Sequence, residues 1–102
     1  MSKPLQNSNE ETIWACVHYF DAKGRQYKLD GLAEELRNIG IKTLRSGFES
    51  DYDGYVEVEI TLEQARALDE KYGSKLYIIG NGSTIEEQFA DALRIEKMCK
   101  SN

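Results

Sequence analysis

The chain has 102 residues, of which 40% are hydrophobic and 30% are charged, and its formal net charge is -5. This length allows one domain with a core of ordinary size, and the content of one proline and eight glycines argues against a fibrous or disordered chain. The acidic balance argues against direct binding of nucleic acid, because contacts with phosphate need clustered lysine and arginine.

The first residues differ in composition from the rest of the chain. Residues 1–11 hold few apolar side chains among Ser, Asn, Gln and Glu, which predicts a flexible tail before a single domain over residues 12–100. No apolar run approaches the ~20 residues that a membrane span needs, and there is no apolar signal segment, so we expect a cytoplasmic protein without a membrane partner. Neither Cys16 nor Cys99 has metal-ligand spacing, and we expect both to be free, buried thiols.

The folded part begins with a predicted strand and turn. Residues 12–20, TIWACVHYF, are rich in β-branched and aromatic side chains, which favours a strand. Residues 21–24 favour a tight turn, and we expect a hairpin return over residues 25–29. Asp30 suits the cap of a first amphipathic helix that ends at Gly40. The predicted buried face of that helix consists of Leu32, Ala33, Leu36 and Ile39.

The middle of the chain predicts two more strands and a second helix. Residues 41–48 resume a strand, residues 49–54 form an acidic turn, and residues 55–60 alternate strictly between apolar and polar side chains. Thr61 and Gln64 have the spacing of a capping box, which begins the second helix. The predicted buried stripe of that helix consists of Leu62, Ala65, Leu68 and Tyr72.

The last part of the chain predicts a short strand, a glycine-containing loop and a long helix. Residues 76–79 are mostly apolar, and residues 80–83 lead into a helix over about residues 84–99 with a capping box of Ser83 and Glu86. The loop would present backbone N–H groups to an anion, but it has no lysine for phosphate, so an ordinary turn is the preferred interpretation. The predicted inward residues of the helix are Ile85, Phe89 and Ala92.

The order of these elements predicts the fold class. Two βαβ units with right-handed crossovers close into an antiparallel sheet with both helices on one face. We therefore expect an α+β fold of the ferredoxin-like βαββαβ kind, extended by an N-terminal hairpin and a C-terminal helix. Because this fold hosts many unrelated functions, the function has to be argued from particular residues.

One face of the predicted sheet gathers aromatic and acidic side chains. When the apolar residues of the strand at 55–60 face the helices, alternation gives the opposite face a defined set of residues. These are Trp14, Cys16, His18, Phe20, Tyr55, Glu57 and Glu59. Such a surface suits protein recognition, because Trp and Tyr supply large contact area at modest entropy cost. The alternatives are that the last helix covers this face as a second core, or that the face binds a small ligand.

His18 is the only histidine and the one side chain suited by its ordinary pKa to proton transfer near neutral pH. An acid–base couple would need Glu57 or Glu59 across the sheet. No activated nucleophile is recognisable nearby, so a structural histidine is the preferred interpretation.

The acidic turn resembles the first half of a calcium loop. It carries Glu49, Asp51 and Asp53 at alternate positions before a glycine. Ile60 stands where the bidentate glutamate of a calcium loop belongs, so a solvated hairpin tip is preferred. We expect no metal and no cofactor.

These observations lead to one leading hypothesis and two alternatives. We expect a small non-enzymatic module that binds a protein partner and regulates or inhibits it, for instance as an inhibitor in a phage or toxin system. Its predicted binding residues are Trp14, His18, Phe20, Asp51, Tyr52, Asp53, Tyr55, Glu57 and Glu59. The first alternative is a ligand-sensing regulatory domain that forms a homodimer, and the second is a small enzyme that uses His18 with Glu57 or Glu59.

Overall fold

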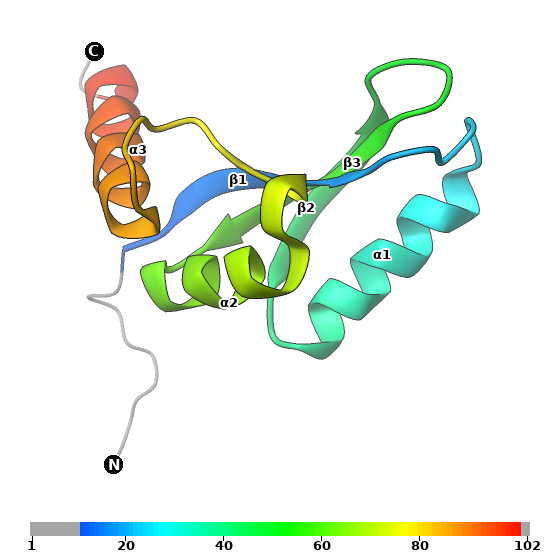
Figure 1. The fold of residues 1–102 in the computed structure, drawn as a ribbon, viewed down its shortest axis with the longest axis horizontal. Helices are drawn as coiled ribbons and strands as arrows, with labels where there is room; N and C mark the ends of the chain where they lie inside the picture. Colours follow the sequence, from blue (N-terminus) through cyan, green and yellow to red (C-terminus); the bar gives the residue numbers. More distant parts are fainter. Residues whose placement is uncertain (1–10, 101–102) are drawn as a thin grey trace.

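Residues 11–100 fold into one sheet and three α-helices, an α+β arrangement as predicted. In the computed structural model, which describes residues 11–100, four antiparallel strands lie in the order β2-β3-β1-β4. Helices α1 and α2 pack on one face of the sheet, and α3 stands beside its end (Figure 1). The strands are β1 (Ile13–Tyr19), β2 (Lys42–Phe48), β3 (Gly54–Ile60) and β4 (Leu76–Ile78). The helices are α1 (Gln26–Asn38), α2 (Leu62–Tyr72) and α3 (Ile85–Lys100), with a 3-10 turn (Gly73–Lys75) before β4. Except for Glu11, the expected flexible tail lies outside the described residues.

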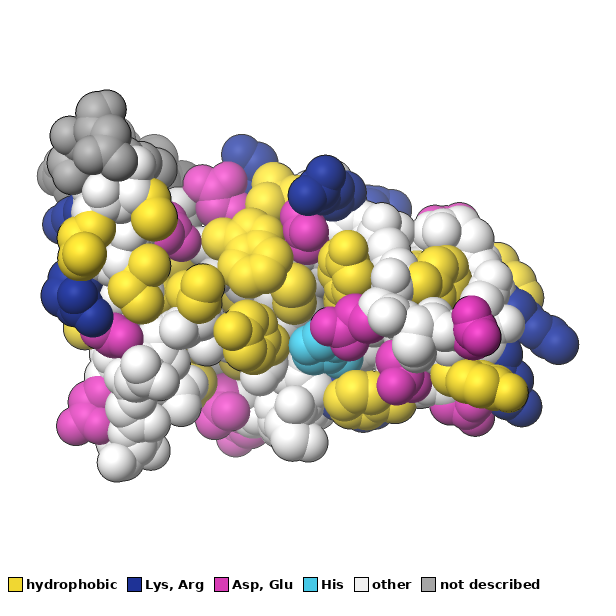
Figure 2. All heavy atoms as spheres, turned by 90° about the horizontal axis from the view of Figure 1, so that it is seen from above, with side chains coloured by type: hydrophobic (Ala, Val, Ile, Leu, Met, Phe, Trp, Pro, Cys, Tyr) yellow, Lys and Arg dark blue, Asp and Glu magenta, His cyan; other side chains and the backbone are white. Residues whose placement is uncertain are grey.

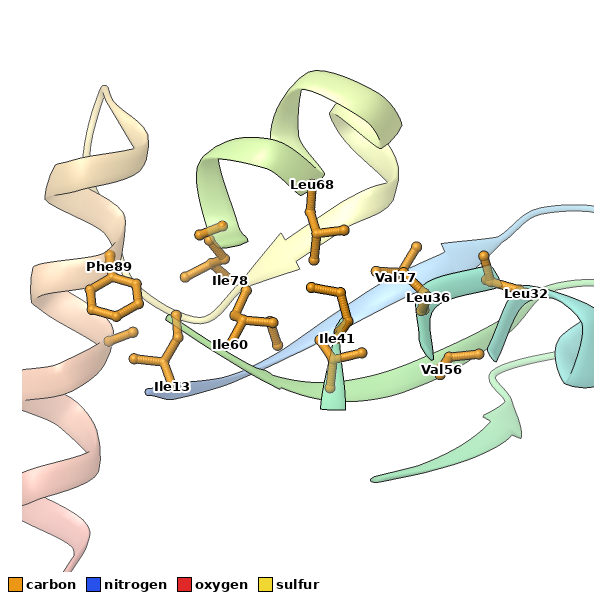
Figure 3. Packing of buried hydrophobic residues seen from close by; sticks show 14 residues of the cluster. Ile13, Val17, Leu32, Leu36, Ile41, Val56, Ile60, Leu68, Ile78 and Phe89 are labelled. Atoms are coloured by element: carbon orange, nitrogen blue, oxygen red, sulfur yellow. The ribbon is translucent and has the colours of Figure 1, made fainter. Parts of the chain in front are cut away.

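β1 is a central strand of the sheet. It pairs with β3 along its whole length, in a register that sets Ile13 opposite Ile60, and with β4 over residues 15–17. Every second side chain of β1 and β3 therefore points toward the helices. This inner set consists of Ile13, Ala15, Val17, Val56, Val58 and Ile60, all of them buried. Leu36 of α1 and Leu68 of α2 cover it (Figure 3), and burying each such side chain contributes about 1.5–3 kcal/mol.

The predicted N-terminal hairpin over residues 25–29 is wrong, because α1 already begins at Gln26. Leu29 explains the difference: it is fully buried on the same helix face as the later leucines, so helical spacing prevails over a hairpin return. Asp30, expected as the cap, lies inside the helix and accepts a hydrogen bond from Gln26 Nε2 at 3.0 Å. Ile39, expected on the buried face, follows the end of the helix and is 48% exposed.

α2 begins at the predicted capping box. Thr61 Oγ1 accepts a hydrogen bond from Gln64 N at 3.2 Å, and Gln64 Oε1 accepts one from Thr61 N at 3.0 Å. These reciprocal bonds satisfy two backbone donors that the first turn of a helix leaves unpaired. Gly73 follows the helix with a positive φ of 59°, a conformation that favours glycine.

The start of α3 differs from the prediction by one residue. The expected pair of Ser83 and Glu86 does not form the cap. Instead, Thr84 Oγ1 accepts a hydrogen bond from Glu87 N at 3.1 Å, and Glu87 Oε1 accepts one from Ser83 N at 2.7 Å. Both spacings contain a hydroxyl and a glutamate three residues later, so the sequence pattern alone could not separate them.

α3 leaves uncovered the face of the sheet that lies opposite α1 and α2. Its Phe89 and Ala92 join the same core cluster as Ile13. Figure 3 shows Phe89 beside Ile13 at the end of the sheet. Glu96 Oε2 of α3 accepts a hydrogen bond from Trp14 N at 2.7 Å. The pairing of β1 with β4 covers residues 15–17 only, so Glu96 provides Trp14 N with a partner that β4 does not provide. The alternative of a second core under the last helix is therefore not what the structure shows.

Candidate binding face

The open face of the sheet carries a shallow hollow of about 390 Å³. Residues from all four strands and from the loop after β2 line it. They are Trp14, Cys16, His18, Phe48, Glu49, Tyr55, Glu57 and Tyr77. Figure 2 shows hydrophobic side chains gathered along the middle of this face, with acidic side chains and the histidine beside them and lysines and arginines mainly toward the edges. We call this surface the aromatic hollow.

Cross-strand pairing brings these side chains together. Cys16 lies opposite Glu57 on one side and Tyr77 on the other, and His18 lies opposite Tyr55. Opposed residues of antiparallel strands point to the same face, so the register itself builds the floor of the hollow. Gly47, opposite Tyr55, leaves room for the tyrosine ring, because a Cβ at Gly47 would lie 2.7 Å from Tyr55 Oη.

Glu57 is 8% exposed and is the only buried charged residue that residues 11–100 contain. Arg45 Nε donates a hydrogen bond to Glu57 Oε1 at 3.0 Å. A bulge in β2 allows this contact, since between Thr43 and Ser46 two residues of β2 stand against Glu57 alone. The buried carboxylate is therefore compensated, while the side chain of Arg45 stays 79% exposed at the rim.

His18 belongs to the aromatic wall of the hollow. The acid–base hypothesis required His18 to pair with a glutamate of β3, and it does not. Its Nδ1 lies 3.3 Å from Oε1 of Glu49, within ion-pair distance, yet this buried atom is not aligned for a hydrogen bond. The His18 ring stacks on Phe20 with centroids 5.7 Å apart and meets Tyr77 edge-on at 6.4 Å. Glu49, and neither Glu57 nor Glu59, is thus the carboxylate partner of His18.

Cys16 is buried at the floor of the hollow and is free, as predicted. Its burial, and then the negative charges of Glu57 and Glu49, raise the pKa of the thiol from 9.0 to about 12. The thiol therefore stays protonated at neutral pH and is a poor nucleophile. Cys99 is also free but exposed, so the expectation of a buried thiol is wrong at that position.

Glu59 and Phe20 border the aromatic hollow without lining it. Glu59 lines a smaller depression together with Trp14, and its Oε1 lies 3.2 Å from Lys42 Nζ. Phe20 follows β1, stacks on His18 and is 49% exposed. The predicted binding residues that do line the hollow are Trp14, His18, Tyr55 and Glu57.

The other predicted binding residues lie in the acidic turn between β2 and β3. This turn is bound to the loop between β1 and α1: Asp53 Oδ1 accepts a hydrogen bond from Asp21 N, and Lys23 N donates one to Tyr52 O, each at 2.9 Å. Tyr52 is 61% exposed, and Asp51 is exposed beside it. Over the described range 11–100, no group of three His, Cys, Asp or Glu side chains is arranged to hold a metal ion.

The loop of residues 80–83 already binds carboxylates of its own chain. Asn81 N donates a hydrogen bond to Asp91 Oδ2 at 2.9 Å, and Ser83 N donates to Glu87 Oε1 at 2.7 Å. The hydrogen bond from Asn81, and then that from Arg94, lower the pKa of Asp91. These carboxylates occupy N–H groups that an external anion would need, which favours the ordinary-turn interpretation.

Sequence reasoning missed several residues of this face: Arg45, Phe48, Glu49 and Tyr77. Alternation would have placed Tyr77 there, because its neighbours in β4 pack against the core. The other three depend on the bulge in β2 and on the course of the loop after it, which no local pattern predicts.

Comparisons of the chain with protein-family models, with curated proteins and with solved structures found no significant match. Between residues 11 and 100, no helix is both long enough and apolar enough to cross a membrane. The functional argument therefore rests on the open face of the sheet.

Proposed function

We propose that this chain is a small protein-binding module that regulates or inhibits a partner protein through the open face. The observation that carries the proposal is the aromatic hollow, which is lined by four Trp, Phe and Tyr rings and the imidazole of His18 and which no helix within residues 11–100 covers. Tyr77 in the hollow is 47% exposed, and Phe20 at its border is 49% exposed. Covering the exposed half of such a side chain in a complex contributes roughly 1 kcal/mol, which favours binding.

The shape of the hollow favours a protein surface over a small ligand. It is open and shallow, whereas small-molecule sites are clefts that bury most of the ligand. The protonated state of Cys16 also supports binding over thiol chemistry.

We also propose that the α+β arrangement is of the ferredoxin-like kind. Two observations support this: the chain order β1-α1-β2-β3-α2-β4, and the neighbour order, which reads β4-β1-β3-β2 from the other edge of the sheet. In this arrangement the helices occupy one face and leave the other for contacts with partners.

A matched pair of tyrosine variants tests the proposed binding face. Tyr77 lines the hollow, whereas Tyr27 is 64% exposed on α1, which packs on the other face of the sheet. A displayed library of protein fragments is selected for binding to the wild-type chain, and the dissociation constants of the binders are then measured with Tyr77→Ala and Tyr27→Ala. We expect Tyr77→Ala to weaken binding about tenfold or more, as for a central aromatic contact, and Tyr27→Ala to leave it unchanged.

The result that contradicts the proposal is a set of binders that Tyr77→Ala does not affect. Circular dichroism and thermal unfolding of both variants show whether the fold is intact. A second variant, Tyr52→Ala, measures whether the acidic turn belongs to the same surface, because Tyr52 is exposed there without lining the hollow.

A further inference from the structure

The aromatic hollow combines aromatic walls with negative charge. Glu49 and Glu57 line it, and no lysine or arginine is among its lining residues. Arg45 reaches Glu57 only through Nε from the rim, and the side chain of Glu49 remains 52% exposed. Glu49 and Glu57 both act on the thiol of Cys16 at the floor, where they add to the effect of burial and raise its pKa. The hollow therefore combines a largely apolar lining with the carboxylate of Glu49, whereas the carboxylate of Glu57 is compensated by Arg45.

This combination suits a cation that loses its water easily. An ammonium or guanidinium group over the face of an aromatic ring gains about 0.5–2 kcal/mol, more when the site excludes water. Tyr55 lines the hollow opposite His18, and Glu49 Oε1 lies 3.3 Å from His18 Nδ1, so an aromatic side chain and a carboxylate lie at the same end of the hollow. The acidic side chains that make the hollow suitable for a cation also disfavour a second copy of the same face, since like charges would meet.

Among the cationic side chains, arginine fits this chemistry best. Its guanidinium is planar and weakly hydrated, it stacks on aromatic rings, and it binds carboxylates with two parallel hydrogen bonds. Lysine is a compact and strongly hydrated charge that loses more on leaving water. We infer that the aromatic hollow accepts an arginine side chain presented by the protein partner, stacked against the rings of the hollow and paired with Glu49. This inference rests on the proposed function and names the chemistry of the partner.

The test measures the binding of single side-chain probes to the full chain by NMR. The probes are N-acetyl-arginine methylamide, the lysine equivalent, and the citrulline equivalent, which keeps the shape of arginine without its charge. The indole N–H of Trp14, the only tryptophan, reports on the hollow. We expect saturable shifts with the arginine probe and about tenfold weaker binding of the citrulline probe, the difference that a charge-assisted contact of this kind supplies. Lysine should bind more weakly than arginine.

Two charge-neutralising variants provide the matched control. Glu49→Gln removes the carboxylate of the hollow, whereas Glu34→Gln removes an exposed carboxylate on α1 and changes the net charge equally. We expect Glu49→Gln to weaken the binding of the arginine probe several-fold and Glu34→Gln to leave that binding unchanged. Equal losses in both variants would reduce the effect to net charge and overturn the inference. The inference would also be overturned if the arginine and citrulline probes, or the arginine and lysine probes, bound equally well, or if the arginine probe caused no saturable shift.

The failure of this inference differs from the failure of the proposed function. If the arginine probe does not bind while Tyr77→Ala still weakens partner binding, the arginine inference is wrong and the proposed function stands. If the arginine probe shifts the Trp14 signal while Tyr77→Ala leaves the binding of the selected partners unchanged, the proposed function is wrong. The inference that the hollow binds arginine then still stands.

Discussion

Replacing Gly80 by alanine tests how α3 is held at the end of the sheet. Gly80 lies in the loop between β4 and α3, directly against the backbone of the helix. A Cβ at this position would lie 2.1 Å from Gln88 O and 2.6 Å from Ala92 N, whereas ordinary contacts begin at 3.4 Å. Because both atoms belong to the backbone of α3, the helix itself must move, and with it the core contacts of Phe89.

The magnitude follows from the cost of forcing atoms into a packed interface. Such overpacking typically costs about 1–3 kcal/mol, and we expect about 2–3 kcal/mol for Gly80→Ala because no side-chain rotation relieves the contact. In a domain of this size, that loss lowers the Tm by roughly 10–20 °C. Gly31→Ala is the matched control: nothing lies within 4 Å of a Cβ there, and the residue is exposed in α1. It should stabilise the fold by about 0.5–1 kcal/mol, because alanine favours a helix interior.

The assay is urea unfolding of the wild-type chain and both variants, followed by circular dichroism at constant temperature. Tryptophan emission recorded in the same experiment reports on Trp14, whose backbone N–H donates to Glu96 of α3. A Gly80→Ala variant within about 0.5 kcal/mol of the wild type, the range of an ordinary surface substitution, would refute the close approach of the loop to α3.

Three further predictions concern thiols, pH and a helix cap. In labelling with a thiol reagent at neutral pH, exposed Cys99 should react quickly. Cys16 is buried and its pKa is raised to about 12, so it should react only when the fold opens; fast reaction of both thiols would contradict this. Since Cys16 keeps its proton in the folded state while the unfolded chain loses it above its ordinary value of 9.0, the free energy of unfolding should fall as pH rises from 9 toward 12, with a smaller fall in Cys16→Ala. Thr61→Ala should cost about 1 kcal/mol in urea unfolding, because Gln64 N loses its acceptor; an unchanged stability would argue against the capping box.

The sequence predicted elements whose signals are local. The strict alternation of residues 55–60 and the box of Thr61 and Gln64 both appear in the structure where they were expected. The start of α1 was missed because Arg25, which precedes the helix, provides no side-chain cap and so no sequence signal. The buried Leu29 was the available clue, since it extends the leucine spacing of the helix toward the N-terminus.

The binding face was predictable in its strand residues and unpredictable in its loop residues. Trp14 and Glu57 followed from the period of two along each strand. Glu49 could not be placed beside His18, because that contact depends on the bulge in β2, where two residues oppose one. The hypothesis that paired His18 with the glutamates of β3 failed for this reason, since strand register alone does not decide which carboxylate of a neighbouring loop reaches a side chain.

The most direct test of the central claim, that the open face is vacant in the isolated chain, is the accessibility of Trp14 at a known molar mass. Trp14 is the only tryptophan and lines the hollow, so quenching of its emission by acrylamide reports on this face alone. Light scattering on the same sample gives the mass, which is 11.6 kDa for one chain. We predict a monomer in which Trp14 is quenched to an extent between those of an unfolded chain and a fully buried tryptophan. A particle of twice this mass in which Trp14 is shielded would contradict the account, because the face would then be occupied by a second copy.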